Sequence, residues 1–133
     1  MGPVIYLDTS ICVYALEAAD ARGDRARDLL AAGGKQFCAS PLVQMECLVK
    51  PFQTGDVTLE RRFRFFFSEI LMLEITSDVF ERAARVRAST GLKTADALHV
   101  AVATAASCDA VWTADIEMVK RSRGYAIDIC AGL

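Results

Sequence analysis

The sequence has little histidine and no paired cysteines. It contains a single histidine, His99, and five cysteines among 133 residues, an odd number with no C-x-x-C pair. The cysteines are scattered, and most have apolar neighbours, where a free thiol behaves as a small hydrophobe: Cys12, Cys38, Cys47, Cys108 and Cys130. This pattern excludes a disulfide scaffold and is typical of a protein in a reducing cytoplasm.

The chain also lacks a strong net charge and a membrane-spanning run. Its net charge is -2 and its pI about 5.4, so any binding of nucleic acid would need a local basic patch. Asp8 interrupts the N-terminal apolar run, which excludes a signal peptide. The apolar segment Ala95–Ala114 contains polar residues that a membrane span rarely tolerates: Asp96, His99 and Asp109. We therefore expect a cytoplasmic protein.

Apolar residues are abundant. The chain is 53% hydrophobic and 24% charged, which is a globular composition and not a disordered one. A length of 133 residues is the size of one domain and is long enough to bury a sizeable core. Because no linker, internal repeat or low-complexity tract divides the sequence, we expect residues 1–133 to form a single domain.

Strand-like and helix-like periodicities alternate along the chain. Short apolar runs predict strands at 4–7, 36–39, 71–75, 110–113 and 126–129. Helical periodicity predicts helices at 11–19, 21–32, 41–50, 58–70, 77–89, 94–106 and 116–122. This alternation favours an α/β fold, in which a mainly parallel sheet of about five strands is covered by helices on both faces.

Caps and prolines predict the helix boundaries in the middle of the chain. Ser40 and Pro41 match an N-cap followed by proline at the first helical position. Pro51 is expected to end that helix and residues 53–57 to form a loop. Thr58 is then expected to cap the next helix.

Two aspartates follow predicted strands. Asp8 ends the first strand, and either Thr9 or Ser10 is expected to cap the helix that comes next. Asp115 stands just beyond the fourth strand, and Glu117 follows it in the first turn of a helix. Ligands of open α/β sheets bind beyond the carboxyl ends of the strands, so both aspartates are candidates for one site. The alternative role for Asp115 is that of a helix N-cap.

Asp96 lies in the first turn of the predicted helix at 94–106. That helix is apolar nearly all round, which indicates an interior position, so the carboxylate must leave the core at the helix N-terminus. It is therefore a third candidate for the site. The alternative is that it only stabilises the helix dipole.

Glu46 shares one helical stripe with Leu42 and Val49, so its carboxylate lies on an otherwise apolar face. Buried acids are rare unless they are paired or bind a cation, which makes Glu46 a fourth candidate. The alternative is a salt bridge, with Lys50 or Lys93 as the partner.

The four acids would need a cation if they converged. Unit charges about 4 Å apart repel by about 4 kcal/mol at an effective dielectric of about 20. Oxygen ligands without a Cys or His set favour Mg²⁺, with Mn²⁺ as a substitute. A carboxylate-bound Mg²⁺ suits phosphoryl chemistry, because it polarises a phosphate oxygen and activates a water.

Four stretches, in their order and spacing, resemble the PIN-domain ribonucleases, and most closely the VapC-type toxins of bacterial toxin–antitoxin pairs. They are Leu7-Asp8-Thr9-Ser10, Gln44-Met45-Glu46, Lys93-Thr94-Ala95-Asp96-Ala97-Leu98-His99 and Trp112-Thr113-Ala114-Asp115. The resemblance covers essentially the whole chain. It implies a PIN-like three-layer α/β/α sandwich in which the matching acids are catalytic and hold Mg²⁺: Asp8, Glu46, Asp96 and Asp115. Many relatives have Asn or Arg in place of Ala114 and Phe in place of Met118, but neither difference removes a carboxylate.

The resemblance also implies an activity and partners. It implies a metal-dependent endoribonuclease that hydrolyses phosphodiester bonds in cellular RNA (tRNA or rRNA) and leaves 5′-phosphate and 3′-hydroxyl ends. It further implies a homodimer and inhibition by a cognate VapB-type antitoxin. Two alternatives remain: a PIN-type RNA-processing nuclease without toxicity, and an aspartate-based phosphoryl signalling module. The residue patterns of receiver domains and of haloacid-dehalogenase-type phosphatases are absent, and both would leave Glu46 unexplained.

Several polar residues stand next to the candidate acids. His99 shares a helix face with Asp96, and it is expected either to act as a base or ligand or to pack, hydrogen-bonded, just under the site. Thr9, Ser10 and Thr113 are expected to hydrogen-bond the acids or metal-bound waters, or else to serve only in caps and turns.

Phe65 falls off the apolar stripe of its predicted helix, so its side chain is expected to be exposed. An exposed Phe suggests a partner surface, and the resemblance implies contact with the antitoxin. The alternatives are stacking on RNA and incidental exposure. Basic residues that could hold phosphates, or could simply be solvated, are Lys93, Lys120, Arg121 and Arg123.

Overall fold

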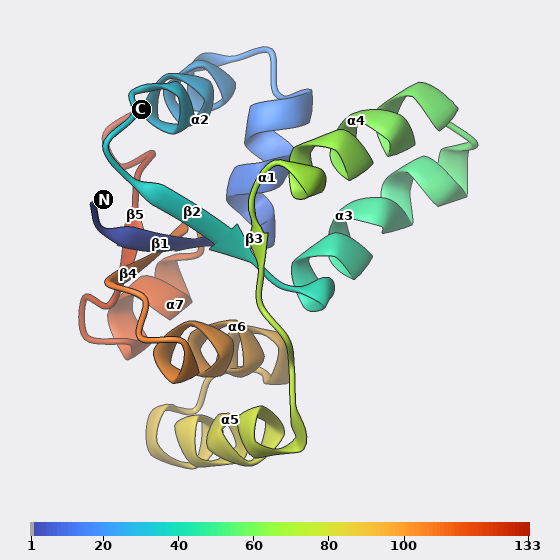
Figure 1. Ribbon diagram of the computed structural model, residues 1–133. Coiled ribbons are helices and arrows are strands. Elements are labelled where there is room, and N and C mark those ends of the chain that lie inside the picture. Colours follow the sequence, from blue (N-terminus) through green and yellow to red (C-terminus); the bar gives the residue numbers. More distant parts are fainter. Residues whose placement is uncertain (1) are drawn as a thin grey trace.

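The sheet is built around β1 (Val4–Leu7), whose last three residues are buried. A computed structural model describes residues 2–133 of the chain (Figure 1). The other strands are β2 (Gln36–Ala39), β3 (Leu71–Met72), β4 (Ala110–Thr113) and β5 (Ala126–Asp128). They form one five-stranded sheet in the order β3-β2-β1-β4-β5, and each neighbouring pair is parallel. The predicted parallel sheet is confirmed.

The strand order creates a topological switch point between β1 and β4. From β1 the chain moves outwards to β2 and β3, and it then returns to β4 and β5 on the other side of β1. Leu7 of β1 pairs with Trp112 of β4, so the residues that follow these two strands leave the sheet side by side. In open α/β sheets, the crevice at such a point is where ligands bind.

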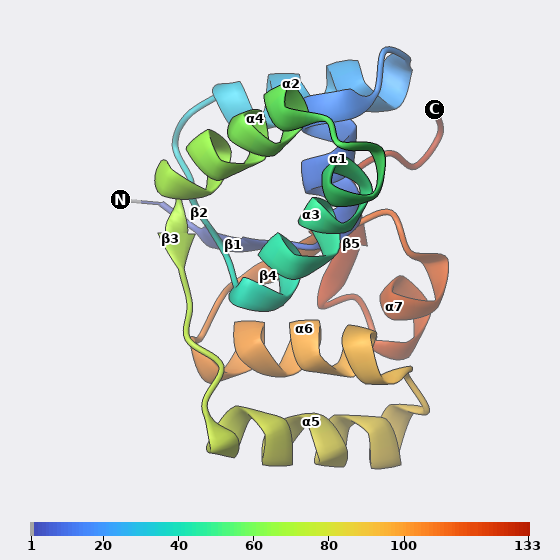
Figure 2. The ribbon, with the colours of Figure 1, turned by 90° about the vertical axis from the view of Figure 1, so that its right-hand side faces the viewer.

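Helices cover both faces of the sheet, as predicted (Figure 1, Figure 2). One face carries α1 (Thr9–Glu17), α2 (Ala21–Ala31), α3 (Pro41–Thr54) and α4 (Val57–Ser68). The other carries α6 (Thr94–Ala105) and α7 (Ile116–Arg121). The remaining helix, α5 (Ser77–Thr90), packs against the side of α6 that faces away from the sheet.

The position of α6 between the sheet and α5 explains why its sequence is apolar nearly all round. All seven residues from Ala97 to Ala103 are buried, including His99. A helix that is covered on two sides needs apolar residues around most of its circumference. Of the helices within residues 2–133, none combines the length and the apolar character that crossing a bilayer would require.

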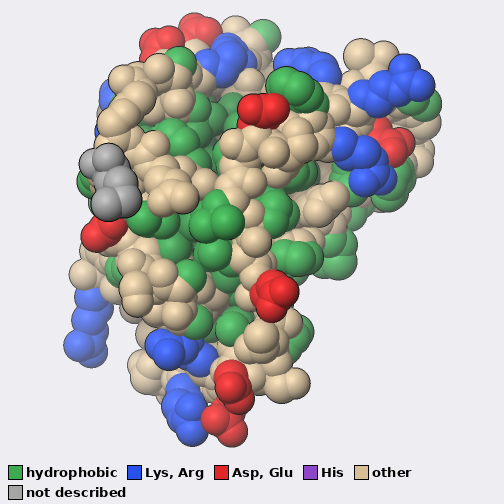
Figure 3. All heavy atoms as spheres, viewed as in Figure 1, with side chains coloured by type: hydrophobic (Ala, Val, Ile, Leu, Met, Phe, Trp, Pro, Cys, Tyr) green, Lys and Arg blue, Asp and Glu red, His purple; other side chains and the backbone are tan. Residues whose placement is uncertain are grey.

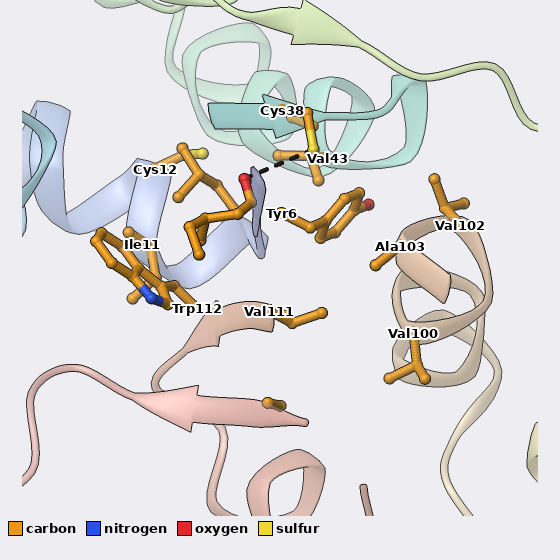
Figure 4. Packing of buried hydrophobic residues seen from close by; sticks show 14 of the residues in the cluster. Tyr6, Ile11, Cys12, Cys38, Val43, Val100, Val102, Ala103, Val111 and Trp112 are labelled. Atoms are coloured by element: carbon orange, nitrogen blue, oxygen red, sulfur yellow. Dashed lines mark hydrogen bonds between the residues drawn. The ribbon is translucent and has the colours of Figure 1, made fainter. Parts of the chain in front are cut away.

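The core lies on both sides of β1. Tyr6 is fully buried, and Figure 4 shows its ring directed toward Val102 and Ala103 of α6. All five cysteines are free thiols, and all but Cys130 are buried. The sulfurs of Cys38 and Cys108 lie 3.5 Å apart.

Two helices begin earlier than predicted, because aspartates cap them. Asp8 is the N-cap of α1, so that helix starts at Thr9 and not near Ile11. Asp56 caps α4 through the backbone N–H of Leu59, which places Thr58 inside the helix. Asp accepts hydrogen bonds from a first helical turn as well as Ser or Thr does, and choosing the hydroxyl residues was wrong.

Two other predicted boundaries were wrong. Pro51 is buried inside α3, which continues to Thr54 and ends at Gly55 in the left-handed conformation, with φ 66°. The predicted loop at 53–57 therefore shrinks to Gly55 and Asp56. The third strand is only Leu71–Met72, because it lies at the sheet edge and pairs with β2 alone.

Candidate active site

The end of β1 places Asp8 at the switch point. The residue is only 6% exposed. Its Oδ1 accepts a hydrogen bond from the backbone N–H of Ser10 at 3.2 Å, and its Oδ2 accepts one from the hydroxyl of Thr113. The backbone N–H of Asp8 donates to the carbonyl of Trp112 at 3.0 Å. The carboxylate is therefore fixed both by its own helix and by β4.

Thr113 joins the two strand-end aspartates. Its buried hydroxyl donates to Asp8 and accepts from the backbone N–H of Asp115 at 2.9 Å. Ser10 ties the same two segments together, because its Oγ accepts from the N–H of Ala114 at 3.0 Å. Asp115 caps α7 through Oδ1, which confirms the predicted N-cap. Its Oδ2 has no hydrogen-bond partner within residues 2–133, so capping leaves one oxygen free.

Asp96 lies half-buried in the first turn of α6. Burial is the main reason why its pKa rises to about 6, and the charges of Asp115 and Asp8 raise it further. Glu46 has a smaller effect in the same direction, and His99 lowers the pKa. Carboxylates shift each other in this way only when they are near one another. Asp96 and Asp115 line one groove, which neither Asp8 nor Glu46 lines. Thr113 links Asp8 to Asp115.

Glu46 reaches the same place from α3. Its Oε1 accepts hydrogen bonds from Thr9 Oγ1 and from His99 Nε2, both at 2.7 Å. The bond from His99 is the main reason why the pKa of Glu46 lies below its usual range, and the bond from Thr9 adds to it. The suggested salt bridge to Lys50 was wrong, because Lys50 pairs with Glu17 at 2.7 Å.

A buried series of hydrogen bonds supports Glu46 from behind. The Oη of Tyr6 lies 2.7 Å from Ser40 Oγ and 2.8 Å from His99 Nδ1. Because Glu46 is ionised, His99 donates to it from Nε2. Burial raises the pKa of Tyr6, so Tyr6 keeps its proton and its hydroxyl links Ser40 to His99. The prediction of a packed, hydrogen-bonded histidine under the site is confirmed.

Ser40 and Tyr6 were not predicted from the sequence as parts of this network. Ser40 stands at the N-cap of α3, as predicted, but its side chain makes no capping bond because its hydroxyl pairs with Tyr6. The position of Tyr6 in a buried strand could have indicated that its hydroxyl needs a hydrogen-bond partner. A tyrosine in a strand buried on both faces needs a partner for its hydroxyl, and that partner has to come from another element.

The donor atoms at the site suit a hard cation. No three or more His, Cys, Asp or Glu side chains within residues 2–133 form a ready metal cage. Mg²⁺ does not need one, because it keeps several waters and binds one or two carboxylates directly. Asp96, Asp115 Oδ2 and Glu46 Oε2 are free of hydrogen bonds to other described residues. The raised pKa of Asp96 also shows that an added positive charge would relieve repulsion.

A groove of about 280 Å³ opens at the acids. Asp96 and Asp115 line it, together with Lys93, Glu117 and Arg121. Glu117 is exposed and pairs with Arg121 at 2.9 Å. Lys93 is exposed and makes no ion pair within residues 2–133, so its ammonium is available to a phosphate.

Phe65 lies in a different place. It is 68% exposed, whereas Phe63 and Phe67 are buried, so the predicted orientation of the helix is confirmed. Phe65 lines a groove of about 540 Å³ between α1 and α4, with Leu16 and Arg62 among its other residues. Figure 3 shows basic and hydrophobic side chains together over α4, at the upper right. None of the four acids lines this groove.

A family model and solved structures both resemble the chain. The model of the PIN domain matches residues 5–123, a range that includes all four acids. No curated protein matches the sequence.

Three solved structures illustrate the likeness. A toxin–antitoxin complex from Klebsiella pneumoniae has a TM-score of 0.77 and 23% identity, over 94% of this chain and 97% of that chain. A sarcin–ricin-loop-cleaving VapC toxin of Mycobacterium tuberculosis has a TM-score of 0.76 and 19% identity, over 91% of this chain and 95% of that chain. A VapBC complex of Rickettsia felis bound to promoter DNA has a TM-score of 0.76 and 17% identity, over 93% of this chain and 97% of that chain. At these identities the likeness establishes the fold.

Proposed function

We propose, since the chain belongs to the PIN domain family, that it is a metal-dependent endoribonuclease and the toxin of a VapC-type toxin–antitoxin pair. The observation that carries the proposal is that Asp96 and Asp115 line one groove at the switch point of the sheet, where Thr113 links Asp115 to Asp8. The charges of Asp115, Asp8 and Glu46, which add to the effect of burial in raising the pKa of Asp96, support a common site. The shared fold with toxin chains supports the VapC type.

In this proposal the four acids would together hold Mg²⁺: Asp8, Glu46, Asp96 and Asp115. A bound divalent cation polarises a phosphate oxygen and lowers the pKa of a water. The protein's part is to hold the reacting groups in place. Hydrogen bonds from Ser10 and Thr113 fix the Asp8 carboxylate, so it does not have to reorganise when substrate binds.

Glu46 would also help to orient the attacking water. Its Oε1 accepts hydrogen bonds from Thr9 and His99, so its Oε2 would serve the metal or a water bound to the metal. The lowered pKa of Glu46 keeps it ionised and able to accept. Hydrolysis would break the bond between phosphorus and the 3′-oxygen. The water would give its hydroxyl to the phosphorus and its proton to that oxygen, which leaves a 5′-phosphate and a 3′-hydroxyl.

The groove between α1 and α4 supports an antitoxin as the partner. Leu16, Phe65 and Phe66 provide apolar surface, and Arg61 and Arg62 provide positive charge. Such a groove fits an amphipathic segment that carries acidic residues. The structures from Klebsiella pneumoniae and Rickettsia felis are themselves toxin–antitoxin complexes, which supports this choice.

An exposed stripe on α3 supports the proposed homodimer. Met45, Val49 and Phe52 are spaced i, i+4, i+7 and are 58%, 48% and 59% exposed. Side chains at this spacing form one continuous face of a helix. An apolar face of this kind favours an interface.

Asp96→Asn tests the nuclease assignment. The change removes a charge and one ligand oxygen from a half-buried position, and we expect RNA cleavage to fall by about 10²–10³-fold or more, as for other lost electrostatic groups. The matched control is Asp78→Asn, because Asp78 is also a first-turn acid but lies on α5. Cleavage is measured on total RNA with Mg²⁺ or Mn²⁺, and folding by circular dichroism. A folded Asp96→Asn protein with wild-type cleavage contradicts the proposal.

A further inference from the structure

A second groove lies beside the carboxylate site and is positively charged. It has a volume of about 500 Å³ and is formed by the end of α5, by α6 and α7, and by the residues that lead into β5. Its charged residues are Lys120, Arg121 and Arg123, and no carboxylate lines it. In a chain with a net charge of -2, three cations around one groove create a local field that attracts anions.

Arg121 connects the two grooves, because it lines both. Its guanidinium is held in place: Nη1 donates to the carbonyl of Thr90 at 2.8 Å, and Nε donates to Glu117 at 2.9 Å. The same guanidinium lies so close to Gly91 that an added Cβ there would be 2.9 Å from Nη1. A polymer bound across Asp96 and Asp115 would therefore pass Arg121, whose side chain is held in place, before it enters the second groove.

Lys120 and Arg123 are free to bind an external anion. Both are exposed, and neither makes an ion pair within residues 2–133. Other cations of the chain differ in this respect, since Arg22 and Arg27 pair with neighbouring aspartates at 2.8 and 2.9 Å. An unpaired cation keeps its full attraction for a phosphate.

The backbone of Arg123 adds a second observation. Arg123 has a φ of 56°, in the left-handed region, just after the end of α7. Gly or Asn is the usual residue there, because a Cβ is crowded by the following carbonyl oxygen in this conformation. The fold therefore holds a long cationic side chain at the groove where a glycine would be less strained.

The remaining lining suits a nucleotide chain. Val86, Val100 and Tyr125 give the groove apolar and aromatic surface, and Tyr125 is anchored by its Oη, which donates to the carbonyl of Cys108 at 2.7 Å. Aromatic surface between cations is the usual composition of sites for single-stranded nucleic acid. The volume also lies within the range of about 300–1,000 Å³ found for ligand sites.

We propose that this groove binds the phosphate backbone of the RNA strand on one side of the cleaved bond, with Lys120 and Arg123 bound to phosphates. The proposal rests on the proposed nuclease function, because the adjoining acids are what make RNA a better occupant than an acidic peptide. It assigns the groove to substrate binding, separate from the groove between α1 and α4.

The test measures RNA binding without cleavage. A fluorescent single-stranded RNA of mixed sequence is titrated with the Asp96→Asn protein over a range of salt concentrations. Adding Lys120→Ala and Arg123→Gly should weaken binding about tenfold, and the log–log salt slope should fall by about 0.7 for each phosphate that the protein no longer neutralises. Arg123→Lys should keep the slope. Arg123→Gly should keep or raise the melting temperature, because glycine tolerates the left-handed backbone.

Arg25→Ala is the control, since Arg25 is an exposed residue of α2 without an ion pair within residues 2–133 and lines neither groove. It should leave the affinity and the slope unchanged. The proposal is overturned if the Lys120→Ala/Arg123→Gly protein binds RNA with the original affinity and slope. It is also overturned if that protein loses only affinity for the antitoxin, which would make the groove a protein-binding surface. Neither result affects the Asp96→Asn cleavage test, so the two proposals fail separately.

Discussion

The carboxylate site and the outer surface formed by α3 and α4 differ in the contacts of their side chains within the protein. At the site, Glu46 and Asp8 are held by hydrogen bonds from several elements. Across residues 2–133, every buried side-chain nitrogen or oxygen has a partner. The outer surface formed by α3 and α4 exposes large apolar side chains that have no such partners: Met45, Val49, Phe52, Val57 and Phe65.

The two regions share α3, which makes the difference instructive. Glu46 faces the site, and its neighbour Met45 is 58% exposed. Residues that are adjacent in a helix point about 100° apart, so one element serves both regions without mixing them. We infer that RNA cleavage depends on a rigid site whose side chains are hydrogen-bonded within the chain. We also infer that partner binding depends on an apolar surface that another chain covers. Substitutions in one region should leave the other unaffected.

The largest effect that is confined to the carboxylate site is expected from substitutions of His99. His99→Leu removes the donor to Glu46, and loss of such a supporting bond usually costs about 10–100-fold in metal affinity or activity. His99→Gln should recover much of the loss, because its amide nitrogen can donate in place of Nε2. The measurements are the Mn²⁺ dissociation constant and affinity for the antitoxin. Equal Mn²⁺ affinity in all three proteins would show that Glu46 does not need this support, whereas antitoxin affinity should not change in any of them.

Phe65→Ala tests the other side of the comparison. Truncating a buried interface anchor costs about 2 kcal/mol or more, which is about 30-fold in dissociation constant. Antitoxin affinity should therefore fall by this factor, with RNA cleavage unchanged. Phe80→Ala is the control, because Phe80 is 56% exposed but lies on α5. Unchanged antitoxin affinity in a folded Phe65→Ala protein would show that the groove between α1 and α4 does not bind the antitoxin through Phe65.

The dependence of metal binding on pH should be confined to the site. Asp96 has a folded pKa raised to about 6, so it holds a proton that a metal must displace below that pH. Mn²⁺ affinity should fall by up to about tenfold per pH unit below about pH 6, and Asp96→Asn should flatten this dependence. A calorimetric titration across pH measures it. A wild-type profile equally flat from pH 5 to 7 counts against Asp96 as a ligand.

The same raised pKa has a consequence for stability without metal. The folded protein binds the Asp96 proton more tightly than the unfolded chain does, whose aspartates have a pKa of about 3.9. The contribution of Asp96 to stability is therefore fully present below about pH 4 and is lost as pH rises through about 6. Thermal unfolding in chelator should show this decline for the wild type and less of it for Asp96→Asn.

Each of the four acids had a local signal in the sequence that indicated its position in the fold. Asp8 and Asp115 follow strands, and a parallel sheet brings strand ends together at the switch point. Asp96 opens a helix too apolar to leave the core. The prediction for Glu46 had a weaker basis. It assumed that the helix stripe shared with Leu42 and Val49 is buried, whereas Val49 is 48% exposed.

The supporting network was not predictable to the same extent. The bonds from Tyr6 to Ser40 and His99 span 34 and 93 residues of sequence, and no local pattern reports contacts of that range. The same holds for Thr113 and Asp8, which are 105 residues apart. Helix ends were wrong where two residues competed for a cap, as at Asp56 and Thr58, because the choice depends on backbone geometry that the sequence does not state.

We propose that Asp8, Glu46, Asp96 and Asp115 form one divalent-metal site. A ligand that binds only the folded state adds about 1.4 kcal/mol at about ten times its Kd. For a domain of this size, that raises the melting temperature by roughly 4–8 °C. Mn²⁺ should produce this shift at a lower concentration than Mg²⁺.

Thermal unfolding of the wild type and Asp8→Asn, in chelator and across a Mn²⁺ titration, tests the claim most directly. Asn can still cap α1 and carries no charge, so the melting temperature of Asp8→Asn in chelator should equal or exceed that of the wild type. Its Mn²⁺-induced shift should be much smaller than the wild-type shift. If both proteins show the same Mn²⁺-induced shift, Asp8 does not bind the metal, and the proposed site is wrong at its centre.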